Sequence, residues 1–348
     1  MGLVNGASYL TNVQGSHASK DPSSRIYLKA PVWPLRDKEE ARLLRHFVER
    51  LSRNFDLTDP LQHFRRVVPQ RAAICPPLLN AILALSARHL SRIGQYDHLI
   101  SNKYIQECLR GLIPMLDDQS ALLDENLLAA TIILRHVEEY EIPVTGQDTS
   151  QQDSHLFGAH TLMNAQERAT VTGGLRQAAF WVGLRQEIYV AFCNQRSIIP
   201  ALEHCNIDRS CTAASDDVWA CRMVVLSADI IRYCFGEHDH PQTTYARLGE
   251  NTAQWYESKP ASFTAVYESL SGDVNVFPVL QYIGDDVVIG MQHYYMSKIL
   301  LVAHNPKIPR LGPLRTAALK AADDEIVQYV RILCGICLSN PDTPPNFM

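Results

Sequence analysis

A segment predicted to form an apolar helix over residues 176–194 carries the polar side chains best spaced to bind a ligand. Arg185 and Tyr189 are four residues apart and so share a helix face, with Trp181 one turn earlier. A guanidinium on an internal helix needs a partner, which an acidic ligand beside the apolar wall of Trp181 could provide. The alternative is a structural ion pair with a carboxylate of the chain. The candidates for that carboxylate are Glu138, Glu139 and Asp148.

His155 is a further candidate ligand-binding residue. It lies in a predicted helix, just before the small-residue step Gly158-Ala159, where a helix can approach a neighbour or a ligand closely. A hydrogen-bonded structural histidine is the alternative interpretation.

Three groups have residue types that bind metals, but none has the four close ligands of a closed zinc site. Cys334 and Cys337 have the spacing of half a site, and no second pair accompanies them, so we interpret them as packed thiols. The other two groups are His238-Asp239-His240, which we interpret as a polar loop, and His204 with Cys205 and Cys211. The sequence therefore predicts no metal and no cofactor. Nine cysteines, an odd number, favour reduced thiols over a disulfide framework.

Motifs of the common enzyme classes are missing from the sequence. It has no Gly-x-Ser-x-Gly elbow, phosphate-binding loop, dinucleotide fingerprint or His-Glu-x-x-His pair. No catalytic residue can be assigned from the sequence, and a non-enzymatic protein is favoured.

The apolar residues recur at helical spacing along most of the chain. Leu43, Phe47, Leu51 and Phe55 begin this pattern, and Pro76-Pro77 opens a second helix. Further helices are predicted at 97–116, 124–140, 155–166, 176–194, 215–235, 245–258, 284–303 and 312–339. No alternating strand pattern is evident, and we expect 259–278 to be an ordered crossover loop. The sequence thus predicts an all-α protein, an orthogonal bundle of about ten helices.

Domain boundaries follow from changes in composition. Residues 1–36 are rich in Ser, Gly, Asn and Pro and are predicted to be a disordered or loosely attached leader. Residues 37–340 form a single large helical domain, and 341–348 a short tail.

The charge and hydropathy patterns exclude two classes of partner. A formal net charge of −5 has the wrong sign for neutralising many phosphates, so we expect no direct contact with nucleic acid. The longest apolar stretch, 127–134, is far shorter than a membrane-spanning helix needs. The N-terminus does not have the pattern of a secretory signal. These features indicate a nuclear or cytoplasmic protein.

A succession of local patterns resembles the fungal-specific transcription factor domain. In order these are PPLLNAILALSARHL at 76–90, YIQECLRGLIPML at 104–116, LLAATIILRHVEE at 127–139, HLFGA at 155–159, AAFWVGLRQEIYVAF at 178–192 and HYYMSKILLVAHNPKIP at 293–309. The resemblance covers roughly residues 38–340. It implies a helical regulatory domain of the kind that follows a zinc cluster in fungal gene regulators.

The sequence departs from the family pattern at both ends. The family's DNA-binding module needs six closely spaced cysteines, whereas the first cysteine here is Cys75. The chain stops at NPDTPPNFM, where relatives usually continue through about two more helices. We therefore expect a regulatory or interaction protein without its own DNA contact, with a protein partner, a second copy or a hydrophobic metabolite as candidate ligands. The alternative is a stand-alone enzyme or carrier for a hydrophobic fungal natural product.

Overall fold

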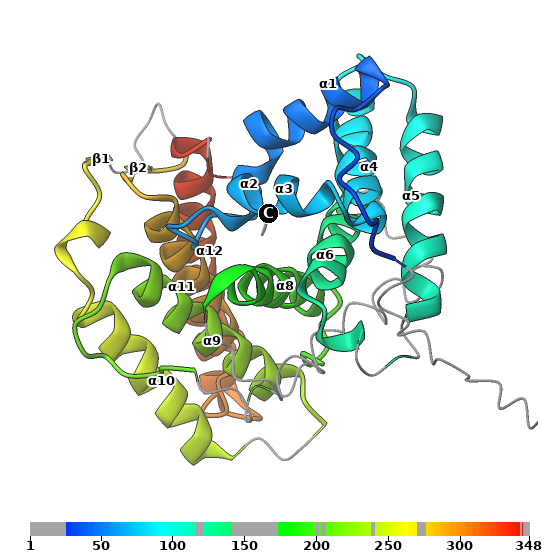
Figure 1. Ribbon diagram of the computed structural model, residues 1–348. Coiled ribbons are helices and arrows are strands. Elements are labelled where there is room, and N and C mark those ends of the chain that lie inside the picture. The colour runs from blue at the N-terminus through cyan, green and yellow to red at the C-terminus, as the bar shows by residue number, and fades with distance from the viewer. Residues whose placement is uncertain are drawn as a thin grey trace, which may run out of the picture.

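The structure is a computed structural model that describes residues 26–115, 118, 121–140, 173–199, 202, 207–237, 241–269, 276–341 and 343. Helices dominate this part of the chain (Figure 1). The N-terminal half contains α1 (Lys38–His46), η2 (Phe47–Leu51), η3 (Ser52–Asn54), α2 (His63–Arg66), α3 (Val68–Ala72), α4 (Pro76–Arg92), α5 (His98–Leu112), η4 (Ile113–Met115), η5 (Ala121–Leu123) and α6 (Glu125–Glu139).

The second half begins with a central helix, α8 (Gly174–Cys193), which lies between α6 and α9 (Figure 1). The elements that follow are α9 (Asp216–Phe235), α10 (Gln242–Glu257), η8 (Ala261–Phe263), α11 (Asp285–Ala303) and α12 (Pro313–Ser339). Two three-residue strands, β1 (Tyr267–Ser269) and β2 (Val279–Gln281), pair antiparallel, with Glu268 opposite Leu280.

The predicted all-α architecture is confirmed. The long helices begin and end within a few residues of their predicted bounds because their start signals are strong. Asp37 accepts a hydrogen bond from the backbone N–H of Glu39, and Asp124 accepts from Asn126 and Leu127, as N-caps of α1 and α6. The predicted helix 155–166 lies outside the described residues.

Short elements were missed from the sequence. α2 and α3 span four and five residues, too few for a helical period to stand out. The predicted crossover 259–278 contains η8 and β1, and a three-residue strand is too short to show an alternation.

The apolar faces of the helices pack into two clusters of buried residues. The larger is centred on α4, which is buried on most sides and packs against α1, α5 and α6. The smaller is aromatic and joins α9, α10 and α11 around Trp219, Trp255 and Phe263. α9 and α11 approach closely at Gly290, where a Cβ would lie 2.8 Å from the Phe263 ring and 3.4 Å from the Ala220 Cα.

Residues 26–36 run along the N-terminal half as an extended segment. The backbone N–H of Leu28 donates to the carbonyl of Ile74, and that of Val32 donates to the carbonyl of Ala73. The Tyr27 hydroxyl contacts Asp124, the cap of α6. The domain boundary at residue 37 stays a prediction, and residues 1–25 lie outside the described part. Within the described residues, no helix is long and apolar enough to cross a membrane.

Candidate functional site

α8 holds Trp181, Arg185 and Tyr189, and the structure places them around two different cavities. Arg185 and Tyr189 line one cavity of about 10 Å³, which has room for a single water molecule. Trp181 lines a separate cleft of about 390 Å³ beside Asp59 and Asp217. The predicted pairing of Arg185 with Tyr189 on one face agrees with this placement, but Trp181 faces elsewhere. The fourth candidate, His155, lies outside the described residues.

Arg185 is buried, and its partners are neutral. Its guanidinium donates to the Thr58 hydroxyl at 2.6 Å and to the Phe55 carbonyl at 3.3 Å. Burial lowers its pKa to about 10, while the carboxylate of Asp56 acts in the opposite direction. It therefore stays protonated at neutral pH, as a buried cation that is satisfied by a hydroxyl and a carbonyl group rather than by the carboxylates considered from the sequence.

The neighbouring residue Glu187 forms the buried ion pair of this helix. Its carboxylate is fully buried and accepts from Arg135 of α6 at 3.2 Å and from Arg196 at 2.7 Å. The backbone N–H of Ile199 donates to the same carboxylate at 3.1 Å. Glu187 therefore connects α8 to α6 and to the segment that follows α8. Its role is structural.

The thiols of α12 belong to packing contacts. Cys337 is buried and accepts a hydrogen bond from the Gln292 amide at 3.1 Å, and burial raises its pKa to about 11. Among the described residues, no group of three or more His, Cys, Asp or Glu side chains could hold a metal ion. The predicted polar loop 238–240 and the pair His204 and Cys205 lie outside those residues.

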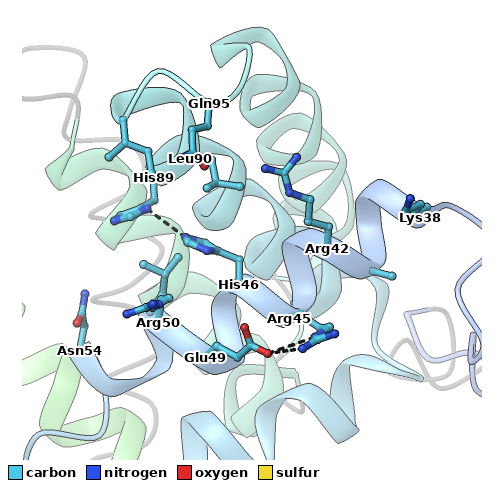
Figure 2. A pocket seen from close by; sticks show the side chains of 13 residues that line it. Lys38, Arg42, Arg45, His46, Glu49, Arg50, Asn54, His89, Leu90 and Gln95 are labelled. Carbon is cyan, nitrogen blue, oxygen red and sulfur yellow. Dashed lines mark hydrogen bonds and ion pairs between the residues drawn. The ribbon is translucent and has the colours of Figure 1, made fainter.

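A larger hollow than either cavity beside α8 lies between α1–η2 and the C-terminal end of α4. This α1–α4 groove has a volume of about 920 Å³ and is lined by residues between 38 and 54 and between 89 and 95 (Figure 2). Its apolar lining includes Leu51 and Leu90, both buried, and Ile93, which is 53 % exposed.

Basic side chains surround the groove. Lys38, Arg42, Arg45 and Arg50 line it, against one acidic residue, Glu49. Lys38, Arg42 and Arg45 follow one another at helical spacing on α1, so they share a face. The chain as a whole carries a net charge of −5, so the groove is a local concentration of positive charge on an acidic protein.

Among the described residues, two of these cations have ion-pair partners and two do not. Arg45 donates to Glu49 at 2.7 Å, and Arg42 donates to Glu39 at 3.4 Å. These pairs are solvent-exposed, and such pairs contribute less than about 1 kcal/mol, so a ligand carboxylate can replace them. Within the described ranges, Lys38 and Arg50 form no ion pair.

Two histidine side chains of the groove lining contact each other. Nε2 of His46 on α1 lies 3.1 Å from Nδ1 of His89 on α4 (Figure 2). Desolvation lowers the pKa of both imidazoles, and each is lowered further by a neighbouring histidine, His89 for His46 and His136 for His89. The pair is therefore neutral at pH 7, with one ring donating and the other accepting.

A third histidine continues this row into the protein. His136 of α6 lies near His89, and its Nδ1 is 2.5 Å from the Glu139 carboxylate. The Tyr140 ring makes edge contacts with both His89 and His136. The groove floor is thus connected to the helices of the main core.

The comparison with known families falls on this part of the chain. Residues 42–181 match the family model of the fungal specific transcription factor domain. The match confirms the predicted resemblance over these residues and supports a regulatory role. It runs from Arg42 in α1 to Trp181 in α8, so it includes most of the α1–α4 groove. No curated protein and no solved structure matches the chain.

Sequence reasoning missed the groove. The available signal was the basic stripe Lys38, Arg42, Arg45, but charged residues at this spacing are also ordinary on the solvent-facing side of an amphipathic helix. The other wall of the groove includes His89, 43 positions after His46, in the last turn of a helix whose apolar sequence predicts burial in the core. No local pattern joins these two segments.

Proposed function

We propose that this chain is a regulatory interaction domain that binds an acidic segment of a protein partner in the α1–α4 groove. The observation that carries the proposal is the charge of the groove, four Lys or Arg side chains against one Glu on a chain with a net charge of −5. The family match supports a role in transcriptional regulation, for which we expect a nuclear location.

The lining favours a peptide with both acidic and apolar residues. Exposed Ile93 offers an apolar contact beside the guanidinium groups of Arg42 and Arg50. An amphipathic segment places apolar anchors in a groove and leaves its charged groups at the rim, where they steer association. α1 and η2 together span fourteen residues, or about 20 Å, which suits a helical partner segment of about twelve residues.

A duplex nucleic acid fits these observations less well. Its phosphates would gain nothing from the apolar part of the groove, and the negative charge of the whole chain opposes a long polyanion. We therefore favour the peptide and treat nucleic acid as an outcome of the test.

Fluorescence anisotropy with a labelled synthetic peptide tests the proposal. The probe is a peptide of about twelve residues of Glu and Leu, with Leu at the i, i+3, i+4 and i+7 spacing of an amphipathic helix, and the matched neutral peptide carries Gln in place of Glu. Reversing the two unpaired cations, Lys38→Glu with Arg50→Glu, should weaken binding of the acidic peptide at least tenfold, or by about 1.4 kcal/mol.

The matched control reverses two exposed cations on α12, Arg315→Glu with Lys320→Glu. It changes the net charge by the same amount, but away from the groove. We expect this control to leave the affinity within about twofold of the unsubstituted protein. Equal weakening by both double variants would indicate nonspecific attraction and contradict the proposal. So would equal affinity for the neutral peptide, or tight binding of duplex DNA in place of the peptide.

A further inference from the structure

The histidine pair of the α1–α4 groove can accept one proton and no more without losing its hydrogen bond. In the neutral pair, one ring donates an N–H to the bare nitrogen of the other across the 3.1 Å between His46 Nε2 and His89 Nδ1. A proton added to the outer nitrogen of the donor ring leaves this bond in place and makes that ring an imidazolium. A second proton would have to enter the shared position, where two N–H groups would oppose each other.

We propose that His46 and His89 take up one proton when an acidic segment occupies the groove, so that binding strengthens as the pH falls. This inference rests on the proposed function and adds its regulation. It makes the site a sensor of pH in the range where histidine titrates.

The surroundings of the pair explain why a ligand would change its protonation. On α1 and η2 the charged neighbours of His46 are Arg42 and Arg50, which oppose a further positive charge, and Glu49, which favours it. A bound carboxylate neutralises those arginines and adds an attraction of its own. Both effects favour the protonated pair when the groove is occupied.

Among the described residues, those on the α6 side of the pair, toward the protein interior, offer no comparable source of negative charge. From α6, His89 meets His136 and the ring of Tyr140, and the carboxylate of Glu139 lies beyond His136 and in contact with it. A positive charge on the pair is therefore best balanced from the groove side, where the ligand binds.

The direction of the pH effect follows from linkage. Desolvation keeps the pKa of each histidine below its ordinary value in the free protein. A bound carboxylate raises it. Between the two values the complex holds one more proton than the free protein, so the dissociation constant falls up to about tenfold for each unit of decreasing pH. Above and below that window the affinity is constant.

Isothermal titration calorimetry with the Glu-Leu peptide, in buffers of different ionisation enthalpy, counts the protons taken up. At pH 6.5 we expect roughly 0.5 to 1 proton per peptide bound, and an overall gain in affinity of about tenfold from pH 8 to pH 5.5. The glutamates of the probe remain largely ionised over this range.

A double variant, His46→Gln with His89→Gln, retains side-chain hydrogen-bonding groups and should bind the peptide with little proton uptake and no more than about a twofold change with pH. His304→Gln, just after the C-terminal end of α11, removes a half-buried histidine away from the groove and should behave as the unsubstituted protein. If the double variant does not fold, histidine side-chain NMR of the unsubstituted protein still decides. The imidazole signals of His46 and His89 should titrate at higher pH with the peptide than without it.

Binding without proton uptake, or with uptake that persists in the double variant, would overturn this inference and leave the proposed function standing. Failure of the peptide to bind at any pH would instead overturn the proposed function, and the inference with it.

Discussion

Removing one charge from the centre of the molecule should cost a large part of its stability. The perturbation is Glu187→Gln, which keeps the shape of the side chain but not its charge. Glu187 is fully buried between Arg135 and Arg196, and the Arg135 side chain is only 4 % exposed. In the described part of the chain, Nε and Nη1 of Arg135 have no hydrogen-bond partner, so its positive charge depends on this carboxylate.

The size of the expected loss of stability follows from the arginine charge that stays buried after the substitution. Breaking a buried ion pair by removing one partner typically costs 3–5 kcal/mol, because the other charge stays buried and uncompensated. The amide oxygen of the glutamine can still accept from the backbone N–H of Ile199 and from one guanidinium, which places our expectation at the lower end, about 3 kcal/mol. For a chain of 348 residues the melting temperature should fall by about 4 °C.

Thermal unfolding followed by circular dichroism measures the effect, and Arg196→Gln is the matched control. Arg196 is 31 % exposed, and its removal leaves Glu187 paired with Arg135, so the control should cost only about 1 kcal/mol. A Glu187→Gln variant within about 1 kcal/mol of the unsubstituted protein would refute the view that this carboxylate balances a buried charge. Equal losses for the two variants would refute the asymmetry between the arginines.

Two further predictions concern buried groups singled out from the sequence. Arg185→Met removes a buried cation, which favours folding, but it leaves the Thr58 hydroxyl and the Phe55 carbonyl without their donor, which opposes folding. We therefore expect the free energy of unfolding, measured by thermal unfolding, to fall by about 1–2 kcal/mol. A decrease above about 4 kcal/mol would indicate that Arg185 has a carboxylate partner. Burial raises the pKa of Cys337 to about 11, so iodoacetamide should modify exposed Cys193 well before Cys337, as read by mass spectrometry, and added zinc should not change the order. Rapid labelling of Cys337 that zinc prevents would contradict the packing interpretation.

The helical architecture could be predicted because its signals are local. The caps Asp37 and Asp124 and the opening Pro76 of α4 mark starts that depend on hydrogen bonds within a few residues. The strands β1 and β2 have no such signal, since each is three residues long and is held by its pairing with the other.

The candidate site could be predicted only in part. Helical spacing determines which residues share a helix face, but not which other segments of the chain pack against that face. Arg185 and Tyr189 do share a cavity, as their spacing implied. The partners of Arg185 come from a turn 127 and 130 residues earlier, at Thr58 and Phe55, and only tertiary packing brings that turn against α8. Trp181 lies on the same helix but is covered by other segments and opens to another cleft.

The α1–α4 groove also shows that the net charge of a chain does not tell where a short charged ligand can bind. Exposed charges farther apart than about 8 Å are largely screened at physiological salt, so a ligand in the groove responds to the groove lining rather than to the sum over the chain. On α1 the acidic residues Glu39 and Glu40 occupy the first turn, where they stabilise the helix dipole, while Lys38, Arg42 and Arg45 follow the groove. The two sets nearly cancel in a count of charges but lie at different places on the helix. An acidic chain can therefore present a basic site.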